Sequence, residues 1–390
     1  MSLTAARGRH PVSAAWRDGD PQGRRQWFVS AKPLGLARGR VLPGYRLAYE
    51  TWGTPAPDRS NAVLVLHALT GDSHVAGPAG PGHPMAGWWD GLVGPGRALD
   101  PAELFIVAPN ALGGCQGSTG PASTAPDALP WGSRFPALTV RDLVTAEAAL
   151  ADHLGIASWA LVVGGSMGGM RALEWAVSYP ARVRGLAVLA TAAQTSADQI
   201  AWTSAQLAAI RGDRGWRGGD YYFAPEGDGP HRGLGMARRI AHVTYRSEPE
   251  LAARFGRSPQ PGEDPWAGGR FAVESYLDHH AGKLVRRFDA GSYVVLSEAM
   301  NLHDVGRGRG GVQQALRRIT ATTVVAGVDS DRLYPLEQQE LLAADIPGAA
   351  RLGVLSSAHG HDGFLVEVDQ VAALLTDLLG AVRTAGGATW

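Results

Sequence analysis

The chain has 390 residues, of which 45% are hydrophobic and 18% are charged, and its 36 basic residues balance 36 acidic ones. This composition is typical of a soluble globular protein, and the absence of a basic excess argues against nucleic acid or a membrane surface as a partner. The single cysteine, Cys115, excludes an internal disulfide framework and a cysteine metal cluster, which favours a reducing compartment and predicts a cytoplasmic location.

The N-terminal segment, residues 1–26, lacks the apolar stretch of about 7–15 residues that marks a signal peptide. It is rich in Arg, Pro, Gly and Asp, so we expect a frayed tail there. No uninterrupted run of about 18 apolar residues occurs along the chain, and no transmembrane helix is predicted.

The first half of the chain alternates apolar strands with helices. The alternating pattern at residues 45–51 predicts a half-buried strand, and the apolar runs 63–66, 104–108 and 185–190 predict buried ones. Residues 139–154 place apolar side chains along one face of a helix. Such alternation is typical of a mainly parallel α/β sheet flanked by helices.

The stretch 159–180 carries the strongest chemical signal. An apolar run leads into the sequence GGSMG at 164–168, and apolar residues at helical spacing follow. A serine at the tip of a strand–turn–helix is held in strained backbone geometry that exposes its Oγ at the N-terminus of the helix. Ser166 is therefore the predicted nucleophile. Because glycine supplies 52 of the 390 residues, the pentapeptide needs support from its context.

The pattern changes over residues 193–319, which contain helical stretches rich in Trp, Arg and Gly but no clear buried strand. Helices are predicted at 197–211, 233–242 and 274–289. We interpret this region as a helical insertion.

The α/β pattern returns after residue 319. The predicted division is a core domain formed by residues 1–192 and 320–390, with a helical lid at 193–319 inserted into it. The elements predicted in the last segment are strands at 322–326 and 350–355 and helices at 336–344 and 366–379.

Each of the last two predicted strands is followed by acid–base candidates, Asp329 and Asp331 after the first and His359 and His361 after the second. In the α/β-hydrolase fold a catalytic triad follows the order Ser, Asp, His, on loops at the carboxyl edge of the sheet. The imidazole takes the serine proton, and the carboxylate fixes the tautomer and stabilises the imidazolium. We predict the triad Ser166, Asp331 and His361, with Asp329 and His359 as competing positions.

An oxyanion hole requires backbone N–H groups near the nucleophile. We predict that Met167, directly after the nucleophile, supplies one, and that Leu69 in the loop 67–71 supplies the other. His67 is expected to shape this loop. Cys115 has no histidine base nearby in the sequence, so we expect it to be structural.

Six sequence motifs in order resemble those of the homoserine O-acyltransferase family, whose members have the α/β-hydrolase fold, and the resemblance covers about residues 34–379. The motifs are HALTG at 67–71, NALGGCQGSTGP at 110–121, GGSMGGM at 164–170 followed by LEWA at 173–176, TYRS at 244–247, SDRLYP at 330–335 and GHDGFL at 360–365.

The resemblance implies transfer of an acyl group from an acyl-CoA, most often acetyl-CoA, to the γ-hydroxyl of L-homoserine on the way to methionine. It also implies a deep active-site tunnel under the lid and a homodimer formed through the lid helices. No metal and no tightly held cofactor are implied, with acetyl-CoA acting as a co-substrate.

The resemblance also assigns substrate-binding residues. Arg238 would pair with the homoserine carboxylate, Asp362 would hold its ammonium group, and Tyr245 would line the same site. A zwitterion in a dry site needs one fixed charge of each sign. The Gly- and Arg-rich stretch 212–232 does not align with the family, which leaves Arg239 as an alternative to Arg238.

The expected mechanism is a ping-pong transfer through an acyl-serine. An esterase or thioesterase with water as acceptor could use the same triad, so the acceptor site decides between them. Within the family, succinyl-CoA as donor and serine as acceptor stay open. A non-enzymatic receptor of the same fold is disfavoured because a binding protein does not need all three triad residues.

Overall fold

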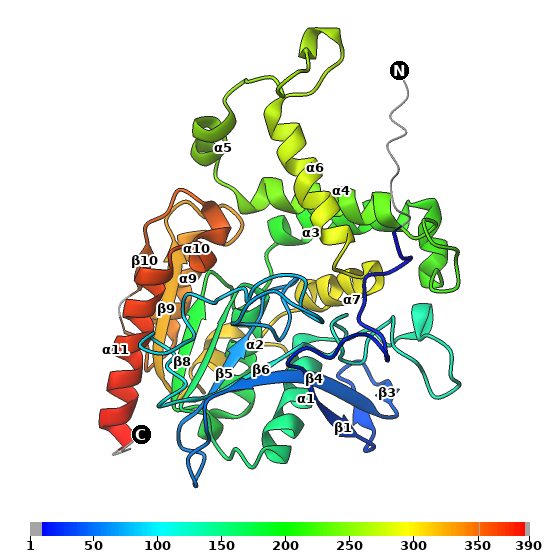
Figure 1. Cartoon of the computed structure of the whole chain (residues 1–390). Coiled ribbons are helices and arrows are strands. Elements are labelled where there is room, and N and C mark those ends of the chain that lie inside the picture. The colour runs from blue at the N-terminus through cyan, green and yellow to red at the C-terminus, as the bar shows by residue number, and fades with distance from the viewer. Residues whose placement is uncertain (1–9, 351, 387–390) are drawn as a thin grey trace.

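The computed structural model describes residues 10–350 and 352–386, and its centre is an eight-stranded sheet with helices on both faces (Figure 1). The strand order is β1-β4-β6-β5-β7-β8-β9-β10. The pairs β1–β4 and β4–β6 are antiparallel, and every later pair is parallel, so the predicted mainly parallel α/β sheet is confirmed. The strands of this sheet are β1 (Gln26–Ser30), β4 (Tyr45–Trp52), β5 (Ala62–Leu66), β6 (Phe105–Pro109), β7 (Leu161–Gly165), β8 (Gly185–Leu189), β9 (Thr322–Val328) and β10 (Gly353–Leu355), and β2 (Leu34–Gly35) pairs with β3 (Val41–Leu42) in a small separate ribbon.

The parallel strands are apolar because both of their faces are covered. Along β5, Leu64 and Leu66 contribute to one apolar cluster together with residues of α1 and α2, whereas Val63 and Val65 contribute to a second cluster with α11. The same alternation runs through β7 and β8. The helices are α1 (Val140–His153), α2 (Met167–Ser178), α3 (Ala197–Arg211), α4 (His231–Tyr245), α5 (Glu248–Phe255), α6 (Ala272–Val285), α7 (Ala290–Asn301), α8 (Val312–Leu316), α9 (Leu336–Asp345), α10 (Gly363–Val366) and α11 (Val368–Gly386).

Two helix starts follow directly from local sequence. Thr139 caps α1 by accepting a hydrogen bond from the backbone of Asp142, whose carboxylate accepts one from the Thr139 amide. Ser196 and Gln199 form the same reciprocal box at the start of α3. Each box satisfies two donors that a helix end leaves free, which explains why the predicted starts of both helices lie within one residue of those observed.

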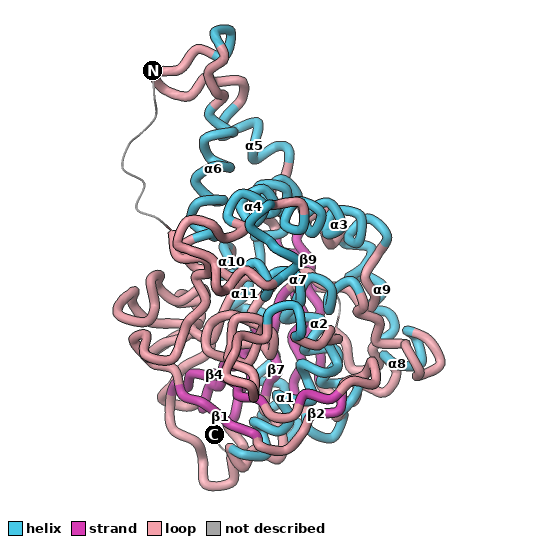
Figure 2. The backbone as a smooth tube through the Cα atoms, turned by 90° about the vertical axis from the view of Figure 1, so that its right-hand side faces the viewer, coloured by secondary structure: helices cyan, strands magenta, loops and turns pink. Residues whose placement is uncertain are grey.

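Between β8 and β9 the described chain is helical, as predicted for the insertion. Figures 1 and 2 show α3 and α4 lying across the upper end of the α/β layers, with α5 and α6 extending beyond them. α7 instead packs into the core, because its Leu296 belongs to the same apolar cluster as Leu143 of α1. The helix predicted at 274–289 is wrong in its end: α6 stops at Val285 and a new helix begins after Asp289.

The expectation of a frayed tail over residues 1–26 is wrong from residue 10 onward, while residues 1–9 lie outside the described part of the chain. The amide of Trp16 donates a 2.9 Å hydrogen bond to the carbonyl of Cys115. The guanidinium of Arg25 is 1% exposed and donates to three backbone carbonyls. Long-range hydrogen bonding of this kind holds a segment that has few apolar residues of its own, and composition alone does not reveal it.

Asp289 connects this N-terminal segment to the lid. Its buried carboxylate accepts hydrogen bonds from Ser13 Oγ at 2.7 Å, Tyr221 OH at 2.6 Å, Tyr222 OH at 3.0 Å and the amide of Ser292 at 2.8 Å. The last of these caps α7. One side chain therefore satisfies donors from three separate segments.

Replacing Asp289 by alanine is expected to lower the free energy of unfolding by about 3 kcal/mol, because buried donors lose their acceptor together. Thermal unfolding followed by circular dichroism measures the loss. Asp220→Ala is the matched control, since Asp220 accepts two hydrogen bonds from Ser133 at the surface. Equal melting temperatures for the two variants would contradict this role for Asp289.

None of the helices in the described ranges combines the length and the apolar character needed to cross a membrane.

Candidate active site

Ser166 lies at a sharp turn between β7 and α2. Its backbone has φ 56° and ψ −124°, a conformation that side-chain-bearing residues rarely adopt. The glycines on either side permit the turn: a Cβ on Gly164 would lie 2.4 Å from the backbone of Gly168, and one on Gly168 would lie 2.1 Å from the carbonyl oxygen of Leu66. The strained serine at a helix N-terminus, predicted from the pentapeptide, is thus present.

His361 and Asp331 form a buried hydrogen-bonded pair. His361 Nδ1 donates to Asp331 Oδ2 at 2.7 Å. The other carboxylate oxygen accepts from the amides of Leu333 at 2.8 Å and Tyr334 at 3.0 Å, which fixes the carboxylate in place. Burial alone would lower the pKa of His361, but the charge and hydrogen bond of Asp331 raise it above its usual value. The pair can therefore hold an imidazolium during a reaction.

The competing positions have other partners. Asp329 accepts hydrogen bonds from Ser356 Oγ and from the amide of Ser357, both at 3.0 Å. The side chain of His359 is 38% exposed, and its Nδ1 lies 3.3 Å from a guanidinium nitrogen of Arg246. The structure brings neither of them into the His361–Asp331 pair.

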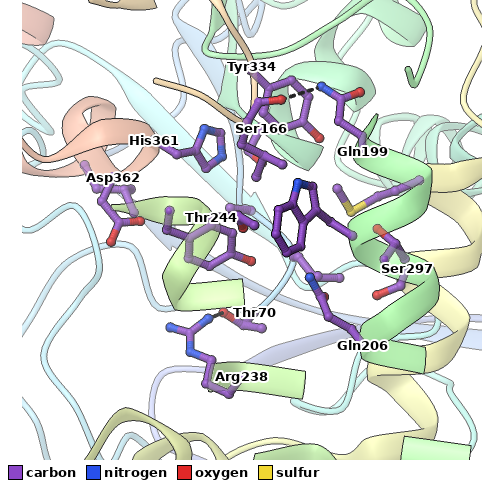
Figure 3. Close-up of a pocket in the computed structure, with 18 of the residues that line it drawn as sticks. Thr70, Ser166, Gln199, Gln206, Arg238, Thr244, Ser297, Tyr334, His361 and Asp362 are labelled. Atoms are coloured by element: carbon purple, nitrogen blue, oxygen red, sulfur yellow. Dashed lines mark hydrogen bonds between the residues drawn. The ribbon is translucent and has the colours of Figure 1, made fainter. Parts of the chain in front are cut away.

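Ser166 and His361 face the same chamber, with Tyr334 beside them (Figure 3). The ring of Tyr334 stacks on the imidazole at 4.9 Å between ring centroids and an interplanar angle of 25°. Among the described residues no hydrogen bond joins Ser166 Oγ to His361. Such catalytic contacts are commonly loose before substrate binds and tighten in the complex.

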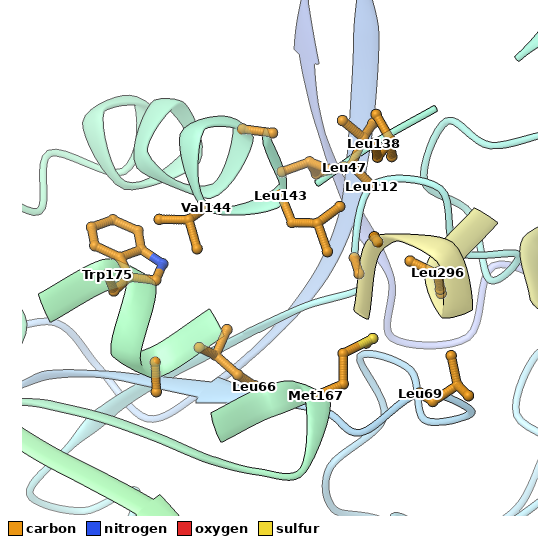
Figure 4. Packing of buried hydrophobic residues seen from close by; sticks show 14 of the residues in the cluster. Leu47, Leu66, Leu69, Leu112, Leu138, Leu143, Val144, Met167, Trp175 and Leu296 are labelled. Atoms are coloured by element: carbon orange, nitrogen blue, oxygen red, sulfur yellow. The ribbon is translucent and has the colours of Figure 1, made fainter. Parts of the chain in front are cut away.

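The two residues predicted for the oxyanion hole are both buried. Met167 is 0% and Leu69 is 7% exposed, and Figure 4 shows their side chains packed in one apolar cluster with Leu66 and Leu296. Such packing holds the two backbone segments still. Because Met167 is the first residue of α2, its N–H has no acceptor within the helix and stays available to an oxyanion.

His67 shapes the loop that carries Leu69. Its Nδ1–H donates to the carbonyl of Ala68 at 2.8 Å, and its Nε2 accepts from the amide of Ala111 at 3.0 Å. Burial, assisted by the charge of Arg171, lowers the pKa of His67 to about 3. A neutral ring with both nitrogens engaged has no proton to exchange with a substrate, so the structural role expected for His67 is supported.

Cys115, the other nucleophile considered, is also buried. Burial raises the pKa of its thiol far above the ordinary value, so the thiolate is not formed at neutral pH.

The chamber in front of Ser166 has a cavity volume of about 100 Å³ and opens to solvent. Its floor comes from loops and turns that follow the strands of the sheet, and its roof comes from helices of the insertion. Polar helix residues such as Gln199, Gln206 and Ser297 also line the chamber. The sequence did not predict this, because polar residues on helices usually face solvent. Its lining includes Leu69, Thr70, Ser166, Gln199, Trp202, Gln206, Arg238, Tyr245, Ser297, Met300, Tyr334, His361, Asp362 and Phe364.

Arg238 and Arg239, adjacent on α4, have different surroundings. Arg238 lines the chamber, where its Nη1 lies 3.4 Å from Thr70 Oγ1 and its guanidinium stands 5.5 Å from the ring centroid of Tyr245. In the described chain it has no ion pair with a carboxylate. Arg239 makes an ion pair with Asp278 of α6 away from the chamber. Arg238 is thus the one of the two that can receive a substrate carboxylate.

Asp362 also lines the chamber, but it has a cation of its own. Arg246 Nη2 lies 3.2 Å from Asp362 Oδ2. An ammonium group bound by Asp362 would therefore share this carboxylate with Arg246. The sequence did not predict the pairing of Arg246 with Asp362 or the position of Tyr334 beside His361, although all three residues lie inside the recognised motifs.

Glu50, His74 and His83 are a buried group whose ligand-type atoms lie within 4.8 Å of one another. Two of their ring nitrogens already have partners: His74 Nδ1 is hydrogen-bonded to Glu50 at 2.9 Å, and His83 Nε2 accepts from the amide of Arg24 at 3.0 Å, while His74 Nε2 has no hydrogen-bond partner among the described residues. Arg24 Nε lies 4.0 Å from the Glu50 carboxylate. An arginine at this distance competes with a metal cation, so this group fits a buried polar network better than a metal centre.

Comparison with known proteins agrees with this geometry. The family model for the alpha/beta hydrolase fold matches residues 61–368. The homoserine O-acetyltransferase of Thermobifida fusca (strain YX) is 68% identical over 95% of this chain and 97% of its own length. The crystal structure of homoserine O-acetyltransferase from Bacillus anthracis has a TM-score of 0.82 and 26% identity, covering 91% of this chain and 97% of that one. The crystal structure of esterase E22 has the same TM-score of 0.82 at 25% identity, covering 91% of this chain and 99% of the esterase.

The α/β-hydrolase fold is therefore the class that this sheet and its serine turn define. Within that class the chain belongs to the homoserine O-acetyltransferase family, whose members are acyltransferases. The resemblance drawn from the six sequence motifs is confirmed.

Proposed function

We propose that the chain transfers the acetyl group of acetyl-CoA to the hydroxyl of L-homoserine, through an acetyl ester on Ser166. The identity of 68% to the Thermobifida fusca homoserine O-acetyltransferase supports the reaction. The observation that carries the mechanism is the buried His361–Asp331 hydrogen bond beside the strained serine.

In the first half-reaction Ser166 Oγ attacks the thioester carbonyl while His361 Nε2 takes its proton. The amides of Met167 and Leu69 stabilise the oxyanion. The C–S bond then breaks, and the proton on His361 passes to the leaving CoA thiolate, which leaves an acetyl ester on Ser166.

In the second half-reaction the homoserine hydroxyl gives its proton to His361 and attacks the acetyl ester. The ester bond to Ser166 breaks, and its oxygen regains a proton from His361. O-acetylhomoserine leaves, and the enzyme returns to its starting state without any metal or tightly held cofactor, which dialysis against a chelator can test.

The acceptor site favours an amino acid over water. Arg238 offers a guanidinium without a carboxylate partner in the described protein, and Asp362 offers an oxygen for the ammonium group. The ring of Tyr245 has its centroid 5.7 Å from that of His361 and 5.5 Å from the guanidinium of Arg238. A carboxylate bound by a half-buried arginine gains charge-assisted hydrogen bonds that water cannot make.

An acetyl esterase or thioesterase is the second candidate, because the fold of esterase E22 matches this chain as closely as that of a homoserine O-acetyltransferase. Release of CoA from acetyl-CoA, measured with and without homoserine, separates the two. A transferase gives one burst of CoA without acceptor and steady turnover with it. Equal steady rates in both cases would identify a thioesterase.

Donor and acceptor choices inside the family are tested in the same assay. We propose acetyl-CoA as the donor, with succinyl-CoA as its competitor, and L-homoserine as the acceptor, with L-serine as its competitor. The ratio of kcat/KM values across these four substrates decides each choice.

Arg238→Ala is expected to spare the acetylation of Ser166 and to slow the homoserine-dependent step by about two to three powers of ten. The arginine acts on a group remote from the reacting hydroxyl, so its loss costs orientation of the acceptor, and breaking a buried charge pair typically costs about 3–5 kcal/mol. Rapid-quench measurement of the two half-reactions provides the numbers. Arg239→Ala is the matched control and should leave both unchanged; a loss confined to Arg239 would reverse the assignment.

We further propose a cytoplasmic homodimer that meets through the lid. Large apolar side chains stand exposed on the insertion, with Trp266 at 96%, Phe223 at 70% and Met236 at 49% exposed. Where exposed apolar side chains gather into a contiguous patch, they mark a protein–protein contact surface. Light scattering coupled to gel filtration measures the mass, and a monomer at micromolar concentration would contradict the dimer.

A further inference from the structure

A second cavity adjoins the reaction chamber and is dominated by basic side chains. It is lined by Arg238, Arg246, Lys283 and Arg287, and it shares Thr70 and Arg238 with the chamber of Ser166. The two cavities therefore adjoin and have part of their walls in common. We call this second cavity the cationic vestibule.

The charges of the cationic vestibule are not balanced by the protein. Asp362 is the acidic residue in its lining, and its ion pair is with Arg246. Neither Lys283 nor Arg287 has an ion pair with a carboxylate among residues 10–350 and 352–386; Arg287 donates to the carbonyl of Thr70 at 2.7 Å. Asp72 lies near Arg287 and contributes to the field there without forming an ion pair. Grouping cations around a cavity is costly unless an anion occupies it.

Two histidines, His242 and His280, also line the cationic vestibule, close to its positive charges. Burial, together with the charges of Arg238, Arg246 and Lys283, lowers the pKa of His280 to about 4. His242 is 2% exposed, and its Nε2 has no hydrogen-bond partner in the part of the chain that the structure describes. A neutral imidazole with a free ring nitrogen can donate to an anion placed in the cavity.

We propose that the cationic vestibule binds the phosphate groups of the acyl donor, with Lys283 and Arg287 as its principal contacts. This inference rests on the proposed function, in which the donor is a CoA thioester. A homoserine carboxylate carries one negative charge, which Arg238 alone can match. The nucleotide end of CoA carries several negative charges, which can also pair with Lys283 and Arg287. A flexible pantetheine arm joins the phosphates to the thioester, and Met85, Trp88 and Leu365 provide apolar wall for it.

The test compares a charged donor with a neutral one. Lys283→Ala and Arg287→Ala should each raise KM for acetyl-CoA about tenfold, the loss expected for one charge-assisted contact. Transfer from p-nitrophenyl acetate to homoserine should keep its KM and kcat, because this donor has no phosphate. Arg286→Ala is the matched control, since Arg286 is exposed, follows the same helix and does not line the vestibule.

Two further measurements sharpen the result. Added salt should raise KM for acetyl-CoA in the wild type more than in Lys283→Ala, because screening weakens an interaction that the variant already lacks. Adenosine 3′,5′-bisphosphate should compete with acetyl-CoA in the wild type and compete about tenfold less well in Lys283→Ala. Unchanged competition would overturn the proposal.

The other outcomes are equally decisive. A variant that loses activity with both donors in the same proportion is damaged in its fold or chemistry, and if both Lys283→Ala and Arg287→Ala behave so, the vestibule is not a phosphate site. Calorimetric binding of CoA itself needs no acceptor and no turnover. CoA binding that weakens in Lys283→Ala while the wild type fails to acetylate homoserine would keep the phosphate site and reject the proposed function.

Discussion

Replacing Ser166 by alanine is expected to lower homoserine acetylation by about 10⁵-fold or more and to abolish the acetyl-enzyme. The reason is chemical: the alanine variant keeps the chamber and the oxyanion donors but has no atom that can accept the acetyl group. The positive φ of residue 166 is imposed by the surrounding turn, and the serine side chain makes no capping hydrogen bond to α2. We therefore expect the alanine variant to fold.

Mass spectrometry of the protein after incubation with acetyl-CoA alone measures this result. One acetyl group should appear on the peptide that contains Ser166, and none in Ser166→Ala. Ser297→Ala is the control, because Ser297 lines the same chamber from α7 and has no role in the proposed chemistry. An acetyl label that persists in Ser166→Ala, or one found on another residue, would reject the covalent mechanism.

The second large effect is expected at the His–Asp pair. His361→Ala and Asp331→Asn should each reduce kcat by about 10⁴-fold or more, since the first removes the base and the second removes the charge that orients and stabilises it. His359→Ala and Asp329→Asn are the matched controls, because each repeats the same change of residue type on the same loop. Steady-state kinetics of all four variants, with circular dichroism to verify folding, separates the positions.

The pH profile gives this pair an independent test. His361 must be neutral to act as a base, so kcat/KM should fall as the pH drops through its pKa. Burial opposes the charged imidazole, but the Asp331 carboxylate outweighs burial and raises that pKa above 6.5. The acid limb of the profile should therefore lie above pH 6.5 and move to lower pH in the residual activity of Asp331→Asn. A limb that stays in place, or equal losses in Asp329→Asn, would assign the base to another residue.

The sequence by itself determined the mainly parallel sheet, the serine turn and the order of the triad candidates. Apolar runs such as 63–66 and 185–190 predict buried strands because a strand covered on both faces must be apolar throughout. The glycines around Ser166 are equally local in their effect, since the turn fails sterically with any other residue at 164 or 168. Capping residues such as Thr139 likewise act within one turn of the chain.

Only the tertiary structure distinguished candidate residues that are neighbours in the sequence. Asp329 and Asp331 are two positions apart, and Arg238 and Arg239 are adjacent, so composition and spacing do not distinguish the members of either pair. The fold does so by placing His361 against Asp331 and by pairing Arg239 with Asp278, which leaves Arg238 in the chamber.

The ordered segment after residue 10 and the cationic vestibule also depended on long-range contacts. Ser13 is 276 positions away from its partner Asp289, and the vestibule collects side chains from α4, α6 and the loop after β5. Periodicity and local propensity describe a chain over a few residues, whereas a buried hydrogen bond or a cluster of charges arises when distant segments pack, and this is why both features emerged from the structure and not from the sequence.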